Sequence, residues 1–163
     1  MLNKFTAYLF TIVIFFSSSL YANPDKGKPI FLESDSAKWD EDSQKSTYRG
    51  NVVVTQGSLL ITGDLLIVTQ ENNEINHMVV TGEKATYKQN TSSGKVVNGE
   101  SLIIEYYINQ FKIVFLEKAI ITQSNNILKN DKIIYKTDSE NIIAGNEKEG
   151  SRVKMTIKPK NNE

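Results

Sequence analysis

The sequence predicts an all-β fold: an open antiparallel roll, or jellyroll, of stacked short strands around an apolar lumen. Three observations lead to this prediction. From Ile30 onward apolar residues recur at every second position, turn-forming clusters interrupt them every ~8–12 residues, and a strand unit repeats along the chain. No window of the sequence keeps the 3.6-residue spacing of an amphipathic helix over three turns.

Composition restricts the chemistry that is available to the chain. The 163 residues suggest one domain, 19 Lys and Arg balance 19 Asp and Glu, and 39% of the residues are hydrophobic. The balanced charge excludes the basic surface of a nucleic-acid binder, and the hydrophobic content is sufficient for a core. Cysteine is absent and His77 is the sole histidine, which excludes disulfides, thiolate chemistry and multi-histidine metal sites. We therefore expect a protein that is not an enzyme and that uses no cofactor and no metal.

The N-terminal segment has the sequence features of a secretory signal peptide, in the usual order. One basic residue in Met1–Lys4 precedes the uncharged apolar run Phe5–Phe16, and small residues then lead to Ala22. The run is shorter than the roughly 20 residues of a membrane-spanning helix, although an uncleaved anchor stays open if the helix continues through Tyr21. We predict cleavage after Ala22, which gives a signal peptide over residues 1–22 and one exported domain over residues 23–163.

The strands follow one another along the whole exported domain. We expect the first at Ile30–Asp35 and the last at Arg152–Lys158, and between them the alternation is clearest at Lys132–Lys136. The enrichment in Ile, Val, Thr and Tyr favours strands, because these side chains suit a pleated, half-buried surface. Turn clusters separate the strands at Asp40–Ser46, Gln56–Ser58, Glu71–Glu74, Asn90–Gly94, Ser124–Asn126, Thr137–Asn141 and Asn146–Ser151.

A strand unit repeats with an offset of 67 residues, which aligns Val53–Gln56 with Ile120–Gln123 and Asp64 with Asp131. A third copy begins at Gly99 and aligns Leu102 and Ile104 with Leu66 and Val68. Each copy places Gly or Asn beside a carboxylate and before an apolar run, a pattern typical of a corner that starts a strand. A short unit of this kind buries its apolar face only by stacking on its neighbours, which favours a roll over a compact sandwich.

Four motifs together resemble the LptA, or OstA-like, family of periplasmic lipopolysaccharide-transport proteins. They are Lys28–Asp35 (KPIFLESD), Gly50–Gly57 (GNVVVTQG), Lys84–Tyr87 (KATY) and Lys129–Tyr135 (KNDKIIY), and the similarity runs from Lys28 to Pro159. The resemblance implies an open β-jellyroll, a periplasmic location and binding of lipopolysaccharide through lipid A. It also implies head-to-tail assembly into a bridge from inner to outer membrane. The implied partners are an LptC-like protein at the N-terminal edge and an LptD-like outer-membrane protein at the C-terminal edge.

A carrier of acyl chains needs an apolar lumen that its own side chains leave unfilled, since each CH₂ kept from water contributes ~0.8 kcal/mol. Alternation identifies the inward residues: Lys132 and Lys136 on the solvent side place Ile133 and Tyr135 inside. The same alternation places Ala85, Phe111, Ile113, Val153, Met155 and Ile157 inside, and an ordinary packed core stays open as an alternative for the whole set. The residues that we expect to bind lipid are Ile30, Leu32, Leu59, Ile61, Leu66, Val68, Tyr87, Leu102, Ile104, Tyr106, Ile108, Phe115, Leu128, Ile133 and Tyr135.

An open roll leaves one free strand edge at each end, and free edges pair with other chains unless they are blocked. Pro29 precedes the first strand and Pro159 follows the last, so both strand bodies can still add to another sheet. The alternative is that the flanking prolines and lysines prevent pairing. We expect self-assembly edges at Ile30 and Leu32 on one end and at Val153, Met155 and Ile157 on the other.

The residues that could form a catalytic site lie in positions that do not suit catalysis. Ser92 and Lys95 have the spacing of a Ser-x-x-Lys dyad, but they lie in a turn where the serine would be fully solvated. Asp64, Glu100 and Asp131 lie on separate corners of the stack, which does not bring them together as paired acid and base. Besides the carrier, we keep an anchored LptC-like component, a structural β-roll scaffold with a dry core, and a hydrolase as alternatives.

Overall fold

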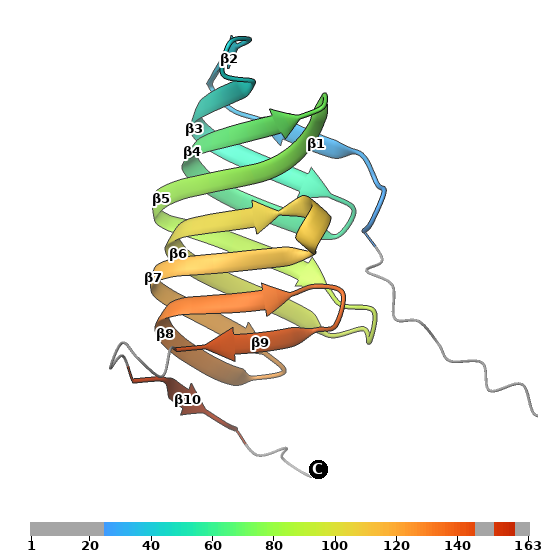
Figure 1. The fold of residues 1–163 in the computed structure, drawn as a ribbon. Helices are drawn as coiled ribbons and strands as arrows, with labels where there is room; N and C mark the ends of the chain where they lie inside the picture. The colour runs from blue at the N-terminus through green and yellow to red at the C-terminus, as the bar shows by residue number, and fades with distance from the viewer. Residues whose placement is uncertain (1–24, 146–151, 159–163) are drawn as a thin grey trace, which may run out of the picture.

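The computed structural model describes residues 25–145 and 152–158, which form one antiparallel sheet of ten strands (Figure 1). The predicted signal peptide, residues 1–22, and the turn predicted at 146–151 lie outside the described residues. The strands pair in the order β1-β3-β4-β5-β6-β7-β8-β10, with β2 also paired to β3 and β9 to β8. The predicted all-β antiparallel fold is therefore confirmed. The strand bounds are Ile30–Glu33 (β1), Ser36–Asp40 (β2), Lys45–Gln56 (β3), Leu59–Glu71 (β4), Glu74–Asn90 (β5), Val96–Tyr107 (β6), Lys112–Gln123 (β7), Asn126–Lys136 (β8), Asn141–Ala144 (β9) and Lys154–Thr156 (β10).

A line of bulges bends the long strands and divides the sheet into two faces. Extra unpaired residues bend a strand, and Figure 1 shows the strands stacked along one axis and folding back on the same side. We call the side of the bend that contains β1 and β10 face A, and the side that contains β2 and β9 face B. The register shifts lie at Arg49/Val52 in β3, Thr62/Leu65 in β4, Thr81/Ala85 in β5, Glu100/Ile103 in β6 and Leu116/Ala119 in β7.

The backbone confirms the 67-residue repeat. At the bend of β3, Gly50 and Asn51 have φ angles of 78° and 46°, in the left-handed region. At the bend of β7, 67 positions later, Glu117 and Lys118 have φ angles of 62° and 54°. The left-handed conformation is favourable for glycine and tolerated by asparagine, so the first copy carries the residues that suit the bend better.

The third copy of the repeat is displaced by two residues, so the prediction that Leu102 points into the interior is wrong. Leu66 and Ile133 lie in one row of paired residues across face B, and the β6 residue in that row is Ile104. The bulge at Glu100/Ile103 interrupts the alternation that the prediction extended. Leu102 therefore lies half-buried on the bend and outside the buried core.

The carboxylates of the repeat lie at the bend, as their corner role predicts. The Asp64 Oδ2 atom accepts a hydrogen bond from the Glu83 backbone N–H at 3.3 Å. Glu100 Oε2 forms an ion pair with Lys84 Nζ at 2.6 Å, in which the lysine is exposed and the glutamate is half-buried. These contacts join neighbouring strands at the corner and add little free energy at exposed positions.

Strand β6 ends earlier than the alternation predicts. After Tyr107 the chain forms a 3-10 turn, η1 (Ile108–Gln110), and Phe111 adopts a φ of 48° that reverses the chain into β7. Ile108 still packs against the core from this turn, whereas Phe111 is half-buried and lies outside the core cluster. The turn contains neither glycine nor proline, and Asn109 is its only turn-forming residue, so its composition gave only a weak turn signal.

The buried apolar side chains form one cluster between the two faces. The alternate residues on the outer surface, Val53, Leu65, Ile67, Ile103 and Ile134, are only half-buried, as expected for a flattened roll with scattered apolar residues outside. The members of the cluster are Val52, Val54, Leu59, Ile61, Leu66, Val68, Met78, Val80, Ala85, Tyr87, Val97, Ile104, Tyr106, Ile113, Phe115, Ala119, Ile121, Ile133 and Tyr135.

Candidate functional site: the apolar interior and its boundaries

The interior of the roll brings together most of the residues predicted to bind lipid. Fourteen of the fifteen lie in or against the buried cluster, and Leu102 is the exception. Both faces contribute, so the side chains of one face point toward those of the other. The fully enclosed members are Leu59, Ile61, Leu66, Val68, Tyr87, Ile104, Tyr106, Phe115, Ile133 and Tyr135, and the half-buried members are Ile30, Leu32, Ile108 and Leu128.

The middle of the interior is filled by aromatic side chains from opposite faces. The Tyr87 ring of face A meets the Phe115 ring of face B edge to face, with ring centroids 5.4 Å apart and planes at 83°. Tyr135, also of face B, meets Tyr87 at 6.2 Å and 73°. Phe115 is 0% exposed, whereas the wall of an open channel would remain accessible to water. The interior is apolar as predicted, but at this level it is packed and not an unfilled lumen.

Two phenol hydroxyls inside this core are hydrogen-bonded, and the core phenols are neutral. Tyr87 donates its hydroxyl to Gln89 Oε1 at 2.6 Å, and Tyr106 donates its hydroxyl to Gln56 Oε1 at 3.0 Å. Burial raises the pKa values of Tyr106 and Tyr135 to about 12, and it raises the pKa of Tyr87 well above the usual value. The phenols therefore place no negative charge beside the apolar surface at neutral pH.

One boundary of the interior is the seam, by which we mean the side opposite the bend, where hairpin turns of face A meet those of face B (Figure 1). Asp25 is buried on this side, and its carboxylate accepts hydrogen bonds from the Ser58 backbone N–H at 2.8 Å and from Ser58 Oγ at 2.6 Å. It also accepts one from Gln89 Nε2 at 2.9 Å. Burial raises the pKa of Asp25, but the hydrogen bonds from Ser58, Gln89 and Lys28 together outweigh burial and lower it. The adjacent Lys26 lies over the Phe111 ring of a face B turn, so this segment joins the two faces.

A second contact closes the seam nearer to β9. The Glu140 carboxylate, in the turn between β8 and β9, accepts hydrogen bonds from Ser92 Oγ and Ser93 Oγ, each at 2.7 Å. It accepts a third from the Ser93 backbone N–H at 3.1 Å. These serines lie in the β5–β6 turn of face A, so Glu140 bridges the two faces. Neither Asp25 nor Glu140 was predictable from local patterns in the sequence, because each acts through partners 33 to 64 residues away in the chain.

The C-terminal end of the roll is an apolar opening. A cavity of about 310 Å³ lies between β7, β8, β9 and β10, and Leu128, Ile142, Val153 and Met155 are among the residues that line it. Val153, Met155 and Ile157 are 45%, 59% and 67% exposed, so these predicted edge residues are not core in the isolated chain. Strand β10 joins the sheet by three residue pairs with β8, and no other described strand pairs with its outer edge.

The N-terminal end is formed by β1, whose outer edge also pairs with no described strand. Ile30 and Leu32 point inward and pack against the core, while Phe31 on the opposite side is 61% exposed. The predicted self-assembly residues thus lie on the two terminal strands of the sheet. In the described ranges no group of three or more potential ligand residues could hold a metal ion, and no helix is long and apolar enough to span a membrane.

Known proteins with the same fold and similar sequence belong to lipopolysaccharide export systems. The lipopolysaccharide export system protein LptH of Pseudomonas aeruginosa is 32% identical over 152 residues, which cover 88% of this chain and 87% of LptH. LptA of Escherichia coli K12 is 32% identical over 137 residues, 83% of this chain and 74% of LptA. The crystal structure of LptH, described as a periplasmic component of the lipopolysaccharide transport device, superposes with a TM-score of 0.76 at 31% identity. It covers 83% of this chain and 99% of the LptH chain. Residues 32–141 match the family described as LptA/(LptD N-terminal domain) LPS transport protein, and this chain therefore belongs to that family.

Proposed function

We propose that the protein carries lipopolysaccharide across the periplasm with the acyl chains of lipid A inside the roll. The observation that carries this proposal is the apolar cluster, which extends through the stack and reaches half-exposed apolar residues at both ends. An acyl chain of 12–14 carbons exposed to water would cost roughly 10 kcal/mol. An apolar interior removes most of this barrier without a specific bond to the lipid.

Loading requires the two faces to move apart, because the middle of the interior is packed. The bend is continuous backbone, whereas the seam is joined by side-chain contacts of Lys26, Glu140 and Tyr106. These contacts are few, and each hydrogen bond contributes only about 1 kcal/mol net, so opening at the seam costs less free energy than breaking the continuous backbone at the bend. The acyl chains then replace contacts that the side chains make with each other.

In the proposed transport path, copies of the protein stack end to end after the signal peptide is removed. The free edges of β1 and β10 are the surfaces for strand addition, with an LptC-like protein at the N-terminal end and an LptD-like protein at the C-terminal end. Transfer between equally apolar interiors is nearly neutral in free energy, so directional flow needs energy from another protein.

Photo-crosslinking tests lipid binding with a matched pair of neighbouring tyrosines. A photoreactive phenylalanine at Tyr106 points into the core, and the same group at Tyr107 points to the outer surface, where Lys112 Nζ lies 3.9 Å from the ring centroid. We expect a lipopolysaccharide adduct from position 106 and little from position 107. Equal adducts from both positions would contradict an interior site.

A structural β-roll scaffold is the second candidate, and the packed aromatic middle favours it. In that case the side chains of Tyr87, Phe115 and Tyr135 form a permanent core. The same crosslinking experiment separates the two functions, because a permanent core gives no adduct at position 106.

A further inference from the structure

The first described residues of the chain form a short strap on the seam. By strap we mean Asp25–Lys28, a turn before β1 in which the Lys28 backbone N–H donates to the Asp25 carbonyl at 3.2 Å. Asp25 is 2% exposed, and its Oδ1 atom lies 3.3 Å from Lys28 Nζ. Gly57, in the β3–β4 turn, makes room for this docking, because a methyl group there would overlap the Asp25 carboxylate and the Lys28 side chain. The strap is therefore closely fitted to the turn that it covers.

Two buried glutamines connect the strap to tyrosines of the core. Gln89 accepts the Tyr87 hydroxyl at Oε1 and donates from Nε2 to the strap carboxylate. Gln56 accepts the Tyr106 hydroxyl at Oε1 and donates from Nε2 to the Lys28 carbonyl at 3.1 Å. The two glutamines are 4% and 6% exposed, so each amide is a buried link between one core phenol and the strap.

The strap determines the orientation of both amides. A carboxylate and a backbone carbonyl only accept hydrogen bonds, so the Nε2 atoms face the strap and the Oε1 atoms face the phenols. If either tyrosine moves, a buried amide oxygen loses its donor, and if the strap leaves, a buried amide NH₂ group loses an acceptor. Leaving a buried polar group without a partner is costly, so the strap and the two tyrosines stabilise each other's positions.

Acyl chains in the interior would displace the same two tyrosines. Tyr87 packs edge to face against two aromatic rings of face B, at the level that must open for loading. Tyr106 belongs to face B and donates to Gln56 of face A, so separation of the faces breaks this link directly. Lys26 is the contact of the strap with face B, since its Nζ atom lies 4.8 Å from the centroid of the Phe111 ring. Movement of the core and movement of the strap are thus mechanically connected.

We propose that the strap closes the seam in a lipid-dependent manner: it is docked while the interior is packed, and lipid that displaces Tyr87 or Tyr106 releases it through Gln89 and Gln56. This inference rests on the lipid binding proposed above. It adds a moving segment and assigns the two glutamines as the residues that couple this segment to the core. Because coupling is reciprocal, release of the strap strengthens lipid binding by the same factor by which lipid weakens strap docking.

Amide hydrogen exchange at Ser58 reports strap docking, because the Ser58 backbone N–H donates to the Asp25 carboxylate at 2.8 Å. Thr91 is the reference, since its backbone N–H donates at 2.8 Å to the Lys95 carbonyl, which lies outside the strap. Lipopolysaccharide in mild detergent would be added to the unaltered protein, with detergent alone as the blank. The exchange rate should rise about tenfold at Ser58 and stay unchanged at Thr91.

Two tyrosine variants test the link from the core side without lipid. Tyr106→Phe keeps the ring but removes the hydroxyl that Gln56 accepts, so it should raise the exchange rate at Ser58 about fivefold. Tyr107→Phe is the matched control, because the Tyr107 hydroxyl donates to Glu105 and not to a glutamine of the strap network. Equal exchange rates in the two variants would overturn the coupling.

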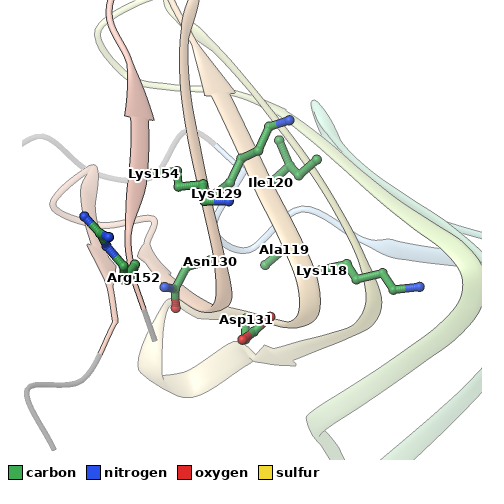
Figure 2. A pocket seen from close by; sticks show the side chains of 8 residues that line it. All are labelled: Lys118, Ala119, Ile120, Lys129, Asn130, Asp131, Arg152 and Lys154. Carbon is green, nitrogen blue, oxygen red and sulfur yellow. The ribbon is translucent and has the colours of Figure 1, made fainter. Parts of the chain in front are cut away.

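Two strap variants test the reciprocal effect, with the affinity for fluorescently labelled lipopolysaccharide as the readout. Gly57→Ala should bind about fivefold tighter than Gly94→Ala, because both glycines have a positive φ but only a methyl group at Gly57 meets the strap. Lys26→Ala, which leaves the turn unaltered, should increase affinity about twofold by removing the contact with Phe111. Its charge-matched control is Lys129→Ala, since Figure 2 shows this exposed lysine at a hollow of about 500 Å³ that no strap residue lines.

The outcomes separate this inference from the proposed carrier function. Labelled lipopolysaccharide that binds without changing exchange at Ser58 would overturn the strap coupling and leave lipid binding intact. Weaker binding by Gly57→Ala than by Gly94→Ala would also overturn the coupling alone. Labelled lipopolysaccharide that does not bind at any concentration would overturn both. Faster exchange with lipid, together with tighter binding by the strap variants, would support both.

Discussion

Replacing Phe115 with alanine measures whether the interior of the roll is packed as the structure shows. The side chain is 0% exposed, it meets Tyr87 edge to face at 5.4 Å, and a methyl group at Gly99 would contact its ring. Removing a buried phenylalanine usually costs about 3–5 kcal/mol, since the transfer free energy is lost and a cavity remains. We expect Phe115→Ala to lower the free energy of unfolding by about 4 kcal/mol.

Urea denaturation of the lipid-free protein gives this value directly. With a slope of roughly 2 kcal/mol per molar, the midpoint should fall by about 2 M. Phe31→Ala is the matched control, because Phe31 is 61% exposed on β1 and its loss should change stability by less than about 0.5 kcal/mol. A loss below about 1 kcal/mol for Phe115→Ala would refute the packed interior and favour an open groove in solution.

Two further predictions concern the seam and the bend. Asp25→Asn should flatten the pH dependence of the free energy of unfolding. Hydrogen bonds lower the pKa of Asp25 in the folded protein. The stability that the Asp25 carboxylate contributes is therefore present above its unfolded pKa of about 4 and is lost as pH falls through the lowered folded pKa. Urea midpoints that fall equally steeply below about pH 4 in both proteins would contradict this role. Gly99→Ala should destabilise by about 1–3 kcal/mol, because the added methyl group overlaps the Phe115 ring, whereas Ala at the exposed neighbour Asn98 should be nearly neutral in thermal unfolding. Equal stability of the two alanine variants would show that the ring moves aside freely.

The periodicity of the sequence predicted the inward residues wherever a strand runs without interruption. Ile133 and Tyr135 follow from the lysines on either side of them, and Leu66 and Phe115, which lie in the same row as Ile133, are buried as expected. The same reasoning failed at Leu102 and Phe111, where a bulge and a 3-10 turn change the side of the sheet to which a side chain points. A shift of one residue reverses the direction of every following side chain, so alternation is reliable only between bends.

The four motifs predicted the family, and the open roll with its flanking prolines predicted the terminal edges, but neither predicted the closed interior. A lumen and a packed core use the same apolar residues at the same spacing, so composition cannot distinguish them. The difference depends on how closely face A approaches face B, which the contacts of Tyr87 with Phe115 and Tyr135 decide.

The sequence by itself determined the all-strand character, the two-residue alternation, the 67-residue repeat and the absence of cysteine chemistry, because each is a property of the residue pattern or of composition. Only the tertiary structure decided that Lys26 and Glu140 close the seam and that Glu33 and Lys154 end one row of paired residues across face A. These contacts and rows join residues that are far apart in the chain. They depend on the register of every strand pair between them and on how sharply the sheet bends, and no local sequence pattern determines either.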